Sequence, residues 1–129
     1  MSTNAGLFSS SLGKKYLMAI TGLFLCSFLI IHFLGNIALF TNPVQFNEYT
    51  RFMSSNPIIR VMEIVLVLGF LTHIIDAIIL TRANKKAQPV KYAMNKNKSS
   101  WYSRNMGLTG TIILVFLILH LQSFWYEYK

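Results

Sequence analysis

Three long apolar segments restrict what this chain can fold into more than any other feature of the sequence. They run over about residues 16–40, 58–81 and 105–126. Each has about 20–25 residues, enough for a helix to cross a hydrocarbon core about 30 Å thick. Within a bilayer, only a helix lets such a segment satisfy its backbone hydrogen bonds on its own. The sequence therefore predicts an all-α membrane protein, a single membrane domain of three transmembrane helices over residues 1–129. Asn56 and Pro57 predict the start of the second helix.

The basic residues lie at the ends of these segments. The net charge is +8, but cations that flank apolar blocks do not form the basic face of a soluble nucleic-acid-binding fold. Nine of the 12 Lys and Arg residues lie before the first segment or in the loop 82–104. The positive-inside rule then places the N-terminus and this loop in the cytoplasm, and the first loop and the C-terminus outside.

Each apolar segment contains one histidine, and the chain has no others: His32, His73 and His120. Ionisable groups at membrane depth are costly and usually face the bundle interior. A hydrogen bond to a neighbouring helix would explain any one of them, but one histidine in every span favours metal ligation.

The depths of the three histidines differ. By helical rise, His32 and His120 share a level about 6–8 Å toward the outside, and His73 lies about 5 Å toward the inside. This predicts two haems stacked across the membrane, with His32 and His120 on the outer iron and His73 on the inner iron. A zinc site would need a compact cluster of ligands at one depth.

Two glycines share helix faces with these histidines. Gly35 follows His32 by three residues, and Gly69 precedes His73 by four. Each glycine leaves room either for a flat macrocycle or for the close helix packing that small residues allow in membranes.

The few acidic residues are candidates for proton handling. Asp76 lies one helical turn beyond His73. It would act near the inner haem or, as we favour, pair with Arg82 or a loop lysine. Glu63 and Glu48 are further candidates, although Glu63 is also placed for an i,i+3 ion pair with Arg60.

Four residues on the inner side have groups that suit haem propionates, because guanidinium and hydroxyl groups bind carboxylates well. They are Arg82, Ser100, Ser103 and Arg104, with Arg104 favoured because it lies where the third helix enters the membrane. For the basic residues, topology control and phospholipid contact are the alternatives.

Several short segments, in this order and spacing, match a known family over nearly the whole chain. They are Gly13-Lys14-Lys15, Thr21-Gly22-Leu23-Phe24, His32 with Gly35-Asn36-Ile37, Ser54-Ser55-Asn56-Pro57-Ile58-Ile59-Arg60, His73-Ile74-Ile75-Asp76, Pro89-Val90-Lys91-Tyr92, Ser103-Arg104-Asn105-Met106 and His120-Leu121. On these residues the chain resembles the cytochrome b membrane-anchor subunit of succinate dehydrogenase and fumarate reductase. The resemblance is to the single-polypeptide form that has two haems and reacts with menaquinone.

The resemblance implies a five-helix haem-binding bundle, of which this chain matches the first three helices. It implies His32 and His120 on the distal haem b, and His73 on the proximal haem b with a histidine from a fourth helix. The last two helices and that histidine are absent from the 129 residues, so we expect a truncated or split form, or a chain that needs a partner.

The resemblance also implies a place in the cell and partners. The chain would be a multi-pass protein of the bacterial inner membrane that docks a flavoprotein and an iron–sulfur subunit at the cytoplasmic face. It would pass electrons between the iron–sulfur subunit and menaquinone, its substrate, and would not itself act on succinate. Glu63 and Glu48 are candidates for the quinone site.

Two alternatives stay open at this point. One is a three-helix, single-haem anchor that pairs with a second small membrane subunit and usually ligates its haem from the second helix. The other is a cofactor-free membrane protein with an assembly or structural role.

Overall fold

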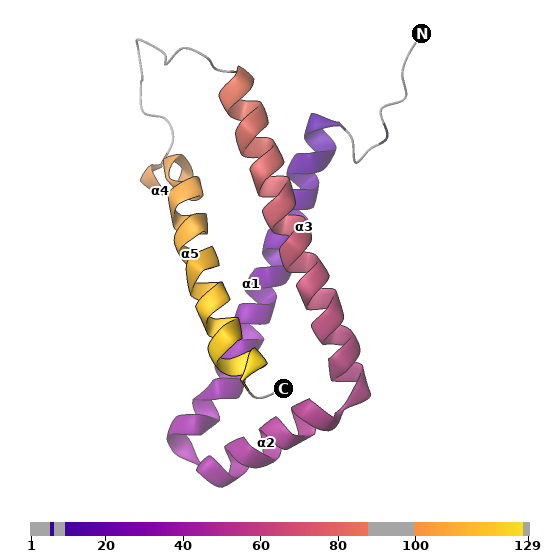
Figure 1. Cartoon of the computed structure of the whole chain (residues 1–129), viewed down its shortest axis with the longest axis vertical. Helices are drawn as coiled ribbons and strands as arrows, with labels where there is room; N and C mark the ends of the chain where they lie inside the picture. The colour runs from indigo at the N-terminus through magenta and orange to yellow at the C-terminus, as the bar shows by residue number, and fades with distance from the viewer. Residues whose placement is uncertain (1–5, 7–9, 88–99, 128–129) are drawn as a thin grey trace. The chain divides into compact units, whose positions relative to one another are not determined.

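The computed structural model describes residues 6, 10–87 and 100–127, and the elements in these ranges are all helical (Figure 1). They are α1 (Ser11–Thr41), α2 (Pro43–Ser55), α3 (Pro57–Ala87), α4 (Trp101–Arg104), α5 (Met106–His120) and the π-helical segment η1 (Leu121–Tyr126). Three stretches are long and apolar enough to cross a membrane: α1, α3 and the continuous Met106–Tyr126. The prediction of an all-α membrane protein with three spans is confirmed.

The helix boundaries follow from capping side chains. The Ser10 hydroxyl accepts a hydrogen bond from the Gly13 amide (3.0 Å), so α1 begins five residues before the predicted span. The Asn56 side chain accepts from the Ile58 amide (2.9 Å), which confirms the start predicted for the second span. Each cap satisfies a backbone donor that the first helical turn leaves without a partner.

Helix α2 differs from the prediction, which has a loop between the first two spans. The Asn42 side chain accepts hydrogen bonds from the amides of Val44 and Gln45 (3.1 and 3.2 Å), and Pro43 occupies the first helical turn. These are ordinary signals of a helix start. The search for apolar runs missed them because α2 has a mixed apolar and polar composition.

The chain forms two compact units, residues 1–87 and 88–129. In the first unit, α1 and α3 run antiparallel and cross, and α2 joins them at one end (Figure 1). Two glycines let them approach. A Cβ atom on Gly22 would lie 3.3 Å from His73 Cε1, and one on Gly69 would lie 2.9 Å from Phe24 Cε1.

The second unit contains α4 and the continuous stretch of α5 and η1. Its large apolar side chains are exposed over the whole helix, among them Leu108, Ile112, Phe116 and Leu119. Most apolar side chains of α1 and α3 are exposed as well. Soluble monomers rarely expose apolar surface on this scale, so a lipid bilayer is the solvent that suits both units.

Candidate functional site

His73 is held against α1 by a hydrogen bond near the crossing of α1 and α3. Its Nδ1 lies 2.8 Å from Thr21 Oγ1. The Thr21 hydroxyl also donates to the carbonyl oxygens of Leu17 (2.8 Å) and Met18 (3.2 Å), four and three residues before it. A hydroxyl has a single proton. When that proton points to a helix carbonyl, Thr21 accepts from a protonated His73 Nδ1; when it points to His73, the Nδ1 atom is the acceptor.

In the arrangement with Thr21 as acceptor, the lone pair of a neutral His73 lies on Nε2. A neutral imidazole ligates a metal through the nitrogen that has no proton, and the hydrogen bond made by the other nitrogen fixes the tautomer and the ring orientation. Gly22 completes the arrangement, because the absence of a Cβ lets the half-buried ring lie close to the backbone of α1. Sequence reasoning singled out neither Thr21 nor Gly22 for the site, although both stand in a segment used for the family resemblance.

His32 lies on the same face of α1 as Thr21, eleven residues further along the helix. That spacing is about three turns and about 16 Å of helical rise. The His32 ring is exposed and stacks on Phe28, with ring centroids 5.2 Å apart. Because His73 lies at the level of Thr21, the imidazoles of His32 and His73 are at different levels of the first unit, and a single iron cannot bind both.

The two glycines that were expected to leave room for either a macrocycle or a neighbouring helix contact side chains of this chain. A Cβ on Gly35 would lie 2.5 Å from the hydroxyl oxygen of Tyr49, which α2 places there. A Cβ on Gly69 would meet the Phe24 ring. Both glycines therefore serve close packing in this structure.

His120 is the last residue of α5 and belongs to the second unit. Its half-buried ring lies between Phe116 and Phe124, with ring centroids 5.4 and 5.0 Å away. The helix changes to π-helical geometry directly after it, at Leu121. Short π-helical segments are rare and occur often at functional sites.

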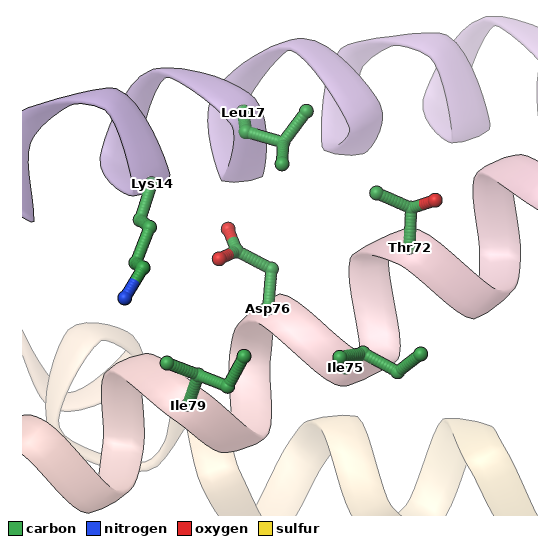
Figure 2. A pocket seen from close by; sticks show the side chains of 6 residues that line it. All are labelled: Lys14, Leu17, Thr72, Ile75, Asp76 and Ile79. Carbon is green, nitrogen blue, oxygen red and sulfur yellow. The ribbon is translucent and has the colours of Figure 1, made fainter. Parts of the chain in front are cut away.

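Asp76 is the buried polar residue of the described chain, with 4% of its surface exposed. Its Oδ2 atom is buried and makes no hydrogen bond. The side chain faces a pocket between α1 and α3, with Lys14 and Leu17 on the opposite side (Figure 2). The favoured pairing with Arg82 is not seen in the described residues. Of the lysines in the predicted loop 82–104, Lys85 and Lys86 lie in the last turn of α3 and form no ion pair with Asp76, and Lys91, Lys96 and Lys98 lie outside the described residues.

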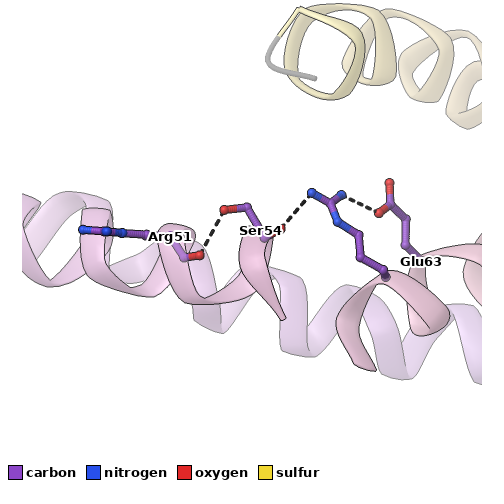
Figure 3. A network of polar contacts seen from close by, with 4 residues as sticks. Arg51, Ser54 and Glu63 are labelled. Carbon is purple, nitrogen blue, oxygen red and sulfur yellow. Dashed lines mark hydrogen bonds and ion pairs between the residues drawn. The ribbon is translucent and has the colours of Figure 1, made fainter. Parts of the chain in front are cut away.

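Glu63 forms the ion pair that its spacing predicts. Its Oε2 accepts a hydrogen bond from Arg60 Nη1 at 2.9 Å, and Arg60 Nη2 donates to the Ser54 carbonyl at 2.8 Å (Figure 3). Arg60 thus ties the end of α2 to the start of α3. Glu48, the second quinone-site candidate, is exposed on α2.

The four propionate-ligand candidates fall in both units. Arg82 is exposed near the end of α3. Ser100 and Arg104 are exposed at the two ends of α4, and the side chain of Ser103 lies outside the described residues.

Within residues 6, 10–87 and 100–127, no three His, Cys, Asp or Glu side chains gather closely enough to hold a metal ion. No family model, curated protein or solved structure matches the chain. The site must therefore be judged on its own chemistry.

Proposed function

We propose that the chain is a haem b-binding membrane-anchor subunit of a succinate:quinone oxidoreductase. In this role it would carry electrons between an iron–sulfur subunit and menaquinone, in the inner membrane of a bacterium. The arrangement of Thr21 and His73 is the observation that carries the proposal. An imidazole within a membrane-spanning helix has its Nδ1 atom 2.8 Å from a hydroxyl oxygen, and donation from Nδ1 would leave the Nε2 lone pair for a ligand.

The donor chemistry fits haem iron. Bound haem supplies one-electron transfer, and axial imidazoles with the surrounding low dielectric set its potential. His73 would hold the inner haem, and His32 and His120 the outer one. The separation of about 16 Å along α1 between the levels of His73 and His32 supports two haem positions over one. Thr21 would orient the His73 ring, and Arg82 and Arg104 are candidates for the propionates.

The direction of the chain in the membrane is part of the proposal. The first turn of α1 and the last turn of α3 carry Lys14, Lys85 and Lys86, and the antiparallel pairing brings these lysines to one end of the first unit. The positive-inside rule assigns that end to the cytoplasm, where the flavoprotein and iron–sulfur subunits would dock. Glu63 and Glu48 would then lie toward the quinone at the outer side.

Affinity purification of the full chain from its host membranes tests this function. We expect a flavin-containing partner and an iron–sulfur partner to purify with it, and the haem b spectrum to become reduced when succinate is added. The role in succinate oxidation would be contradicted if no flavoprotein purified with the chain and succinate did not reduce its haem.

The single-haem anchor is favoured by one observation. His73, which a hydrogen bond to Thr21 holds against the first span, is on the second span, where that form of anchor has its ligand. The haem content per chain separates the two proposals. A content of two haems per chain supports the two-level arrangement. A content of one haem per chain that is unchanged in a His32→Ala variant supports the single-haem form.

A further inference from the structure

The pocket between α1 and α3 contains a pair of opposite charges that the proposed function does not use. It has a volume of about 320 Å³ and is lined by Lys14, Leu17, Thr72, Ile75, Asp76 and Ile79. Lys14 and Asp76 are the only charged residues among the six. Figure 2 shows the Lys14 ammonium and the Asp76 carboxylate directed into the same space from the two helices.

The Asp76 carboxylate lacks a partner in this pocket. It is almost fully buried, its Oδ2 atom makes no hydrogen bond, and the described residues show no ion pair between Asp76 and Lys14. A buried polar oxygen without a hydrogen bond is costly, and more so in a membrane. The pocket therefore calls for a ligand that brings a hydrogen-bond donor, preferably a cation, to Asp76.

Lys14 adds a second requirement, because its ammonium offers three donors and a positive charge. A simple cation would be repelled by Lys14 and would find only one carboxylate among the lining residues. A simple anion would be repelled by Asp76. A zwitterion with an anionic group for Lys14 and an ammonium for Asp76 satisfies both side chains.

The position of the pocket identifies the zwitterion as a lipid headgroup. Lys14 lies in the first turn of α1, at the same end of the antiparallel pair as Arg82, Lys85 and Lys86 of α3, where the apolar spans stop. Ile75 and Ile79 are 57% and 40% exposed beside the carboxylate and offer an apolar wall to an acyl chain. Long basic side chains at this depth extend toward phosphate groups.

We propose that this pocket binds phosphatidylethanolamine, with the lipid phosphate at Lys14 and the primary ammonium at Asp76. The lipid site does not depend on haem, so its test is independent of the test of the proposed function. In this site the Asp76 carboxylate would select phosphatidylethanolamine over two other lipids. Phosphatidylcholine has a phosphate but no N–H donor, and phosphatidylglycerol has no cation.

Native mass spectrometry of the purified full chain, released from vesicles of equal parts of the three lipids with identical acyl chains, tests the proposal. We expect phosphatidylethanolamine to be retained about threefold or more over phosphatidylcholine, the scale of one polar interaction in a membrane. Asp76→Asn should bring this ratio close to one and should raise the retention of anionic phosphatidylglycerol, which the Asp76 carboxylate no longer repels. Lys14→Gln should lower the retention of all three lipids, whereas Lys15→Gln, a change at the exposed neighbouring lysine, should have no effect.

A series of headgroups tests the wild-type chain without any substitution. Retention should fall as the ethanolamine nitrogen receives one, two and three methyl groups, because each methyl removes a donor. Equal retention across the series, or an Asp76→Asn ratio that matches the wild type, would overturn the site.

Discussion

At the scale of single residues, the Thr21–His73 contact determines what the second span can do. Threonine in an apolar helix satisfies its own proton on a carbonyl one turn back. Its oxygen is then available to accept from His73 Nδ1, an arrangement that would fix the Nδ1–H tautomer. The three histidines were identifiable from the sequence, because ionisable groups stand out in apolar spans. Thr21 was not, because the spacing within one helix does not say which residue of the next helix lies opposite.

Replacing Thr21 by valine tests this contact. The side chain keeps its shape and loses the oxygen, so the His73 ring loses the partner that fixes its orientation. Loss of such a partner weakens metal binding by about 10–100-fold, and we expect haem retention during detergent washing to fall on this scale. Thr21→Ser keeps the hydroxyl and should retain haem as the wild type does. Equal retention by the valine variant would show that the contact is not needed for ligation.

At the scale of helices, the spans were predictable and their contacts were not. Length and hydropathy located α1, α3 and the last span, since twenty or so apolar residues have few alternatives. The ends were less accurate: α1 begins five residues before the predicted span, and α3 continues six residues beyond it, into the predicted loop 82–104. Helix α2 was missed because its signals are caps and not an apolar run. The partners of Gly35 and Gly69 required knowledge of the helix crossing, which no pattern within one helix supplies.

Gly69→Ala tests the close approach of α1 and α3. The added Cβ would lie 2.9 Å from Phe24 Cε1, so the ring must move. We expect the free energy of unfolding in mixed micelles to fall by about 1 kcal/mol, at the lower end of overpacking costs, because a side chain and not the backbone must yield. Gly107→Ala is the matched control, since its Cβ would have no atom within 4 Å. If both changes had the same effect, the crossing would not depend on Gly69.

At the scale of the whole molecule, exposed apolar surface and the distribution of charge define how the chain would lie in a bilayer. Both units expose apolar side chains along their spans, as expected when lipid is the solvent. The orientation rests on the basic residues alone. The chain has one cysteine, Cys26, so a Cys26→Ser background allows new cysteines to be placed one at a time.

Thiol labelling of intact cells tests that orientation. In this background, Glu48→Cys on α2 should react with a membrane-impermeant maleimide added from outside. Lys86→Cys, at the basic end of α3, should react only after the membrane is permeabilised. Both residues are exposed, so access to the reagent depends on the side of the membrane. The reverse pattern would place the basic end outside and rule out docking of cytoplasmic subunits there.

The most direct test of the central claim is the haem content of the purified chain and its histidine variants. We predict that the wild type binds haem b with a bis-histidine spectrum, and that His73→Ala and His32→Ala each lower the haem content by removing different haems. Thr111→Val, which removes a hydroxyl that donates to the Gly107 carbonyl in its own helix (2.7 Å), should leave the haem content unchanged. Retention of the wild-type haem content and spectrum by both alanine variants would contradict ligation by these residues.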